Sequence, residues 1–67
     1  GVNMCLSTVY VQVKGQRQKV MQDVAKMEFC NEGYLLIGLL GDKKTVDGQI
    51  TKIDFIDDHL VILESEE

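Results

Sequence analysis

The chain has 67 residues and a formal net charge of −4, from eleven acidic and seven basic residues. That length allows one domain, and a domain of this size buries only about 60% of the surface that its unfolded chain exposes. Nucleic-acid binding takes most of its affinity from Lys and Arg side chains that neutralise phosphates, so the acidic balance argues against that function. Three of the acids lie in residues 64–67, and the rest of the chain is closer to neutral.

Two further features limit the classes of protein to which this chain can belong. Two cysteines, Cys5 and Cys30, are too few to predict a disulfide scaffold. No stretch resembles a signal peptide, and no apolar run approaches the roughly 18 residues that span a bilayer. We therefore expect a cytoplasmic protein that does not bind membranes.

The first three residues, Gly1-Val2-Asn3, have no apolar pattern and precede a plausible initiator methionine, Met4. We interpret them as the remnant of an expression tag and leave them out of the fold argument. Residues 4–67 are then expected to form a single small β domain.

The first half of the chain predicts strands. Residues 4–13 alternate in polarity and place Val9, Val11 and Val13 on one face, which is typical of a β-strand. Residues 14–17 contain a glycine and predict a turn, followed by a short return strand over 18–21. Residues 22–23 break the pattern, and 24–30 alternate again. A helix over 19–27 stays possible, because apolar residues there also recur at helical spacing, but we favour strands.

The second half predicts more strands separated by turns. Residues 31–33 form a turn, and the apolar run 34–40 predicts a strand buried on both faces, in a barrel core or beneath a partner subunit. Gly38 within that run indicates a bulge or a close approach of another backbone. A turn over 41–44, a short strand at 45–46, and strands over 49–56 and 59–63 complete the chain. Five to six short strands predict an all-β fold, with a small antiparallel SH3-like barrel as the first choice.

The sequence offers no constellation of catalytic residues. The single histidine, His59, follows Asp57-Asp58, and this triplet is more simply an exposed turn than a metal site. No glycine-rich phosphate loop, CxxC pair or nucleophile elbow is present, so we predict that the protein is not an enzyme. Cys30 at a strand end is expected to pack as a small hydrophobic residue.

Cys5 offers a more specific chemistry because it follows Met4. Removal of the initiator methionine would leave a free α-amine beside the thiol, and this pair can chelate one metal ion once the thiol loses its proton. Two chains at a two-fold axis would supply two sulfurs and two nitrogens. A planar set of this kind suits Ni(II) or Cu(II), whereas Zn(II) prefers a tetrahedron. The alternative is a cysteine that merely begins a strand.

A family resemblance adds to this interpretation. The opening stretch over residues 4–11, Met-Cys-Leu-Ser-Thr-Val-Tyr-Val, resembles the start of the CooT-type nickel-binding proteins. The similarity continues through Asp23-Val24, the Leu39-Leu40-Gly41 end of the apolar run and residues 48–54, and it ends at residues 60–64. No single motif is highly specific, but order, spacing and length agree over nearly all of residues 4–67.

The resemblance implies a homodimer with an SH3-like β fold that binds Ni(II) between its subunits through Cys5. It also implies a role in nickel supply for carbon monoxide dehydrogenase, with that metalloenzyme or its maturation machinery as a partner. In this chain the nitrogen of Cys5 is a peptide amide, so we expect metal binding to be weakened and Ni(II) to be absent. Cys30 is not part of the family pattern.

Two alternatives remain. Some related proteins carry the label of predicted RNA-binding protein, and an RNA-binding β-barrel would use Tyr10 and Tyr34 as stacking platforms. The acidic balance and the four aromatic residues count against it. A third hypothesis is a structural module that docks a larger protein through its apolar strand.

Overall fold

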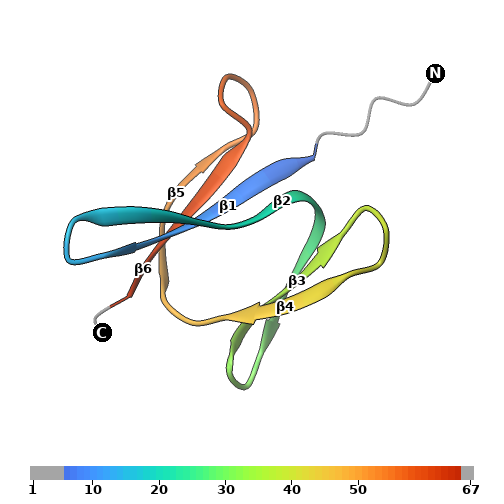
Figure 1. Cartoon of the computed structure of the whole chain (residues 1–67), viewed down its shortest axis with the longest axis horizontal. Coiled ribbons are helices and arrows are strands. Elements are labelled where there is room, and N and C mark those ends of the chain that lie inside the picture. The colour runs from blue at the N-terminus through green and yellow to red at the C-terminus, as the bar shows by residue number, and fades with distance from the viewer. Residues whose placement is uncertain (1–5, 66–67) are drawn as a thin grey trace.

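The computed structural model describes residues 6–65, which form six β-strands and no helix. Figure 1 shows how the strands are arranged. The all-β prediction is confirmed. The strands are β1 (Ser7–Val13), β2 (Gln16–Cys30), β3 (Gly33–Gly38), β4 (Lys43–Val46), β5 (Gln49–Asp54) and β6 (Leu60–Ser65). Within residues 6–65 there is no helix long and apolar enough to cross a membrane.

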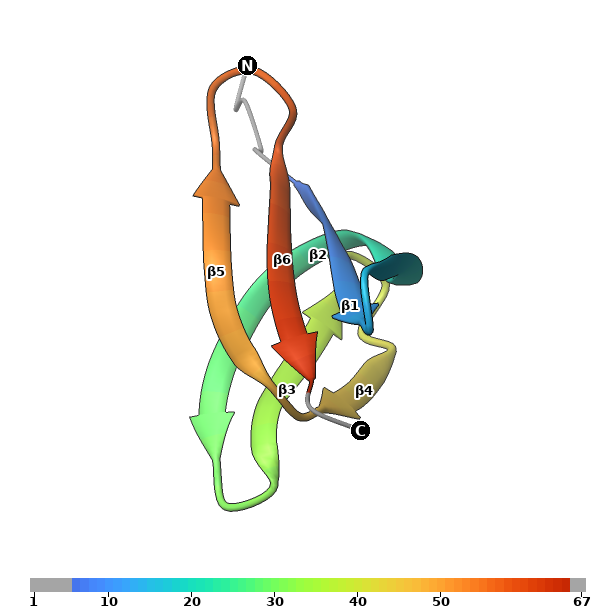
Figure 2. The ribbon, with the colours of Figure 1, turned by 90° about the vertical axis from the view of Figure 1, so that its left-hand side faces the viewer.

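All six strands belong to one strongly curled sheet with the order β4-β3-β2-β1-β6-β5 (Figure 2). Neighbouring pairs are antiparallel except β1 and β6, which run parallel with Thr8 opposite Leu60. The edge strands β4 and β5 do not pair with each other. The structure therefore confirms a small barrel-like β fold, and it refines the prediction in two respects: one strand pair is parallel, and the barrel is not closed.

β2 is one long bent strand, so the prediction of two strands separated by a break at residues 22–23 is wrong, and so is the helical alternative over 19–27. The break is a bulge inside the strand. Ser7 pairs with Val24 but Val9 pairs with Met21, which leaves extra residues on β2, and Asp23 has a φ of 57°. Two more register shifts flank this one: Val9 pairs with Met21 but Tyr10 with Lys19, and the pairing with β3 shifts between Val24 and Lys26. Bulges bend a strand and increase its twist, so β2 pairs first with β1 and then, beyond the bend, with β3.

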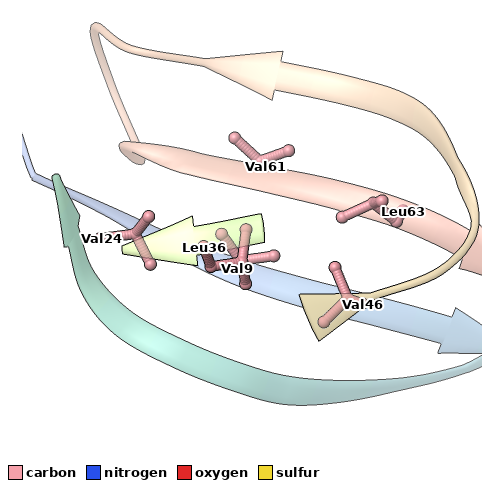
Figure 3. Packing of buried hydrophobic residues seen from close by; sticks show 6 residues of the cluster. All are labelled: Val9, Val24, Leu36, Val46, Val61 and Leu63. Atoms are coloured by element: carbon pink, nitrogen blue, oxygen red, sulfur yellow. The ribbon is translucent and has the colours of Figure 1, made fainter. Parts of the chain in front are cut away.

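The core lies on the inner face of the curled sheet, where the two halves of β2 bring its partners together (Figure 3). Val9, Leu36 and Leu63 are fully buried there, from β1, β3 and β6 respectively. The remaining buried members of the cluster are Val24, Val46 and Val61. Every strand except β5 contributes a buried residue to this cluster, and Ile50 of β5 packs against it.

The apolar run 34–40 is only partly buried, which corrects the expectation of burial on both faces. β3 ends at Gly38, and Leu39 and Leu40 lie in the following turn with 48% and 92% of their surface exposed. The turn is fixed by hydrogen bonds from the Gly38 amide to the Asp42 carbonyl (2.7 Å) and from the Leu39 amide to the Asp23 carbonyl (3.0 Å). A side chain at position 38 would collide with Asp42 and Met21. The close approach at Gly38 is therefore made by side chains, and not by another backbone as the sequence predicted.

The bounds of the last three strands also differ from the predictions. β4 begins at Lys43, inside the expected turn, and β5 ends at Asp54 rather than at residue 56. β6 covers Leu60–Ser65 rather than 59–63. The largest difference lies between β5 and β6, where the loop covers residues 55–59 and the expected turn covered only 57–58.

Leu36→Ala should destabilise the fold severely, because Leu36 is fully buried where β3 packs on β1. Truncation of a buried leucine costs about 2–5 kcal/mol, which is comparable to the total of about 3–9 kcal/mol expected for some 60 residues. Urea denaturation measures the loss. Leu40→Ala is the matched control and should change the unfolding free energy by less than about 0.5 kcal/mol. Equal losses in the two variants would contradict the assignment of the core.

Candidate functional site

The predicted metal ligand, Cys5, lies outside the described residues, but the structure shows what surrounds the start of β1. The amide of Thr8 donates a hydrogen bond to the carbonyl of His59 (2.9 Å). Because β1 and β6 run parallel in register from Thr8 and Leu60, the first residues of β1 lie beside the end of the β5–β6 loop (Figures 1 and 2).

The β5–β6 loop is held by the carboxylate of Asp54. Its Oδ1 atom accepts hydrogen bonds from the amides of Asp57 (2.9 Å) and Ile56 (3.0 Å). These hydrogen bonds favour the charged carboxylate and so lower the pKa of Asp54 below its ordinary value of 3.8. The bond from the Asp57 amide has the larger effect, and the bond from the Ile56 amide the next. The side chains of Ile56, Asp57 and Asp58 are left exposed beside the start of β1.

His59 differs from the exposed turn residue that the sequence predicted. It is half-buried, has a φ of 52°, and its Nδ1 atom is buried with no hydrogen-bond partner within the described chain. Asp57, Asp58 and His59 do not form a metal site: among residues 6–65 no group of three or more His, Cys, Asp and Glu side chains is placed to hold a metal ion.

Cys30 lies far along β2 from the start of β1. It is half-buried at the end of that strand, opposite Gly33, whereas Ser7 at the start of β1 pairs with Val24. Figure 2 shows the β2–β3 turn at the opposite end of the molecule from the β5–β6 loop. The structure therefore gives no reason to group Cys30 with the start of β1.

Tyr10 and Tyr34, the residues of the RNA-binding alternative, lie on opposite faces of the sheet. Tyr34 packs against the core on the inner face, with its ring edge-to-face with Phe29 at 5.6 Å between centroids. Tyr10 follows buried Val9 in β1 and so points outward, where the Arg17 guanidinium lies 5.6 Å from its ring centroid. The structure does not bring the two tyrosines into one stacking platform.

Sequence reasoning missed an open apolar groove between β2 and β5. It has a volume of about 260 Å³. Its lining consists of Ser7, Val9, Val24, Ala25, Lys26, Met27, Ile53, Phe55 and Val61. The one signal in the sequence was the alternation of Ile53 and Phe55. In the structure Ile53 pairs with buried Val61, and the Ile53 and Phe55 side chains are each more than half exposed.

Comparisons with known proteins agree with this fold. The model of a family described as "CO dehydrogenase accessory protein CooT" matches residues 4–64. The crystal structure of a protein proposed to be CooT from Carboxydothermus hydrogenoformans superposes on the chain with a TM-score of 0.83. The two sequences are 24% identical, and the match covers 94% of this chain and 100% of that one. Among curated proteins, no sequence matches significantly.

Asp54→Ala should destabilise the protein in a pH-dependent way. The folded-state pKa of Asp54 lies below its ordinary value of 3.8, so its stabilisation is fully present above that value and is lost as the pH falls through the lower, folded-state pKa. The difference in unfolding free energy between wild type and variant should be constant above about pH 5 and shrink toward pH 3. Urea denaturation at several pH values measures this difference in unfolding free energy. A difference that grows as the pH falls would contradict the stabilising role of the Asp54 carboxylate.

Proposed function

Because the chain belongs to the CooT family of CO dehydrogenase accessory proteins, we propose that it carries a metal ion, Ni(II), through Cys5 and supplies it to CO dehydrogenase. Membership of an accessory-protein family means that the protein is not an enzyme. The observation that supports the metal assignment is the start of the family match at residue 4, which makes Cys5 the second residue of the matched region.

The donor chemistry favours Cys5 over other residues. The described part of the chain holds no cluster of metal-binding side chains, so a stable site needs ligands from outside it or from a second chain. Thiolate sulfur selects soft or borderline metals, and paired sulfur and nitrogen donors in a plane suit Ni(II). One Cys5 from each of two chains, each with its own backbone nitrogen, supplies such a set.

A homodimer is the assembly that brings two such ligands together, and we propose it on the basis of the surface beside the start of β1. Ile56, in the adjacent β5–β6 loop, is 85% exposed. A two-fold axis near this loop would bury both Ile56 side chains and place the two chain starts close together. Hydrophobic burial would then provide most of the dimer stability, independently of the metal.

The cellular setting follows from the same chemistry. A thiol that must stay free to bind metal is best kept in a reducing compartment, so we place the protein in the cytoplasm. Its partners are then a second copy of the chain and the metalloenzyme that receives the nickel. RNA binding is not proposed, because the two tyrosines that it would use lie on opposite faces of the sheet.

Cys5→Ala should abolish Ni(II) binding, whereas Cys30→Ala should bind one Ni(II) per two chains as the unmodified protein does. Isothermal titration under reducing conditions measures both affinity and stoichiometry. Urea denaturation of both variants should show cooperative unfolding, so that a loss of binding reflects a lost ligand and not an unfolded chain. Loss of binding in Cys30→Ala with retention in Cys5→Ala would overturn the proposal.

A chain that begins at Cys5 should bind Ni(II) more tightly than the chain that begins at Gly1. In the longer chain the nitrogen of Cys5 is a peptide amide, which holds its proton far more strongly than an amine does, so it ligates less readily. Both chains should remain dimeric when a chelator removes the metal. Equilibrium dialysis compares the affinities, and light scattering gives the mass. Equal affinities, or dissociation to monomers on chelation, would count against this account.

A further inference from the structure

We propose that the apolar groove between β2 and β5 receives the thiol of Cys5, and that Phe55 at its rim is a positioning residue for the metal site. The identity of the metal ion rests on the proposed function. The position of the thiol is argued separately, from the strand order, the regularity of β1 and the lining of the groove.

The order of the strands places the start of β1 at the groove. β1 lies between β2 and β6, and Ser7, the first residue of β1, is itself part of the groove lining. Within the described chain, β2 has no partner on the β1 side after Val24, the residue that pairs with Ser7. A continuation of β1 before Ser7 would therefore run between this edge of β2 and the β5–β6 loop, which carries Phe55.

The regular alternation of β1 directs Cys5 toward the groove. Ser7 and Val9 are buried and line the groove, and Thr8 between them is half-buried on the other face. β1 pairs with β6 without a register shift, and the register shifts between β1 and β2 leave their extra residues on β2. Alternate residues of a strand share a face and lie about 7 Å apart. A continuation of β1 through Leu6 therefore places the Cys5 side chain on the groove face, whether the chain begins at Gly1 or at Cys5.

The surface of the groove suits a thiol. Its floor is formed by Val9, Val24 and Val61, all nearly or fully buried. A cysteine thiol packs as a small hydrophobic group, so this floor favours the thiol over a position that faces water.

The same floor favours one composition of the loaded site. Ni(II) held by two thiolates and two neutral amines has no net charge, so it loses little when apolar walls replace water. Two backbone amides that bind after losing their protons would add two negative charges, and a net charge is costly to place in apolar surroundings. The groove therefore favours the chain that begins at Cys5, in which the ligating nitrogen is an amine.

Phe55 is the groove residue best placed to limit where the thiol lies. The amides of Ile56 and Asp57 bond to the Asp54 carboxylate, so the backbone on both sides of Phe55 is held. The Phe55 side chain lines the groove yet is 57% exposed, so its removal should cost the fold little. It precedes Ile56, which the proposed dimer places near the two-fold axis. The groove therefore opens toward the second chain, which supplies the second Cys5.

The first experiment uses the metal-free full chain with Cys30→Ala, in which Cys5 is the only thiol. NMR should show nuclear Overhauser contacts from the Cys5 β-protons to the methyl groups of Val24 or Val61. Alkylation by iodoacetamide should be at least about tenfold slower than in urea at the same pH, because the thiol must leave the groove to react. In the matched control, Cys5→Ala with Met4→Cys moves the only thiol to the opposite face, where it should react nearly as fast as in urea.

Equal protection of the thiols at positions 4 and 5, or no contact between Cys5 and the groove, would overturn the proposal. A mixture of isotope-labelled and unlabelled chains separates contacts within one chain from contacts between two chains. Contacts found only between chains would assign the groove to the Cys5 of the other chain, and the proposal would again be wrong.

The second experiment titrates Ni(II) into the chain that begins at Cys5, again with Cys30→Ala. Phe55→Ala should weaken binding about tenfold, as the loss of an outer contact does at other metal sites, and should shift the thiolate-to-nickel absorption bands. Phe55→Leu should restore most of the affinity. Leu40→Ala, at a side chain 92% exposed and outside the groove, should change neither affinity nor spectrum. Unchanged affinity and spectrum in Phe55→Ala, or a loss that accompanies dissociation to monomers in light scattering, would remove the positioning role.

Two outcomes separate this inference from the metal assignment. A Cys5 thiol that is protected and contacts the groove, in a protein that binds no Ni(II), would support the position of the thiol and remove the metal function. Ni(II) binding through a Cys5 thiol that is no better protected than a thiol at position 4 would keep the metal function and overturn this inference.

Discussion

The bend in β2 is the constraint on which the rest of the structure depends. The six-stranded sheet has one apolar face to bury, and residues 6–65 contain no helix to cover it, so the sheet must fold over itself. The left-handed Asp23 and the three register shifts of β2 between Lys19 and Lys26 allow that turn within a single strand. As a result, Leu36 of β3 packs against Val9 of β1 and Leu63 of β6. Regular pairing of β2 with β1 along its whole length would leave this face exposed to water.

The same bend leaves the sheet open. Among residues 6–65, β2 has a partner on one side only where it leaves β1, and β5 has one only on the β6 side. Exposed edges invite pairing with other chains unless they are short, charged or covered. Here β4 carries two lysines, whereas the groove beside β5 is apolar.

Features set by residues close together in the sequence could be predicted, whereas features set by contacts between distant residues could not. The alternating valines of β1 and the glycine turns are local signals, so the all-β class and most strands were predictable. The long bent β2 was not, because Gln22-Asp23 looks like a turn and only the partners on either side show that the strand continues. Leu39 and Leu40 were misassigned for a similar reason: their exposure follows from the hydrogen bonds of Gly38 and Leu39 to Asp42 and Asp23. The thiol chemistry of Cys5 singles it out as a candidate metal ligand, but no sequence pattern predicts where its sulfur atom lies.

The central claim is that two Cys5 residues share one nickel ion between two chains. X-ray absorption at the nickel edge, on the loaded chain that begins at Cys5, tests it most directly. The account predicts two sulfur and two nitrogen ligands in a planar arrangement, at one nickel per two chains. A site of nitrogen and oxygen ligands without sulfur, or one nickel on each chain with a single sulfur, would contradict it.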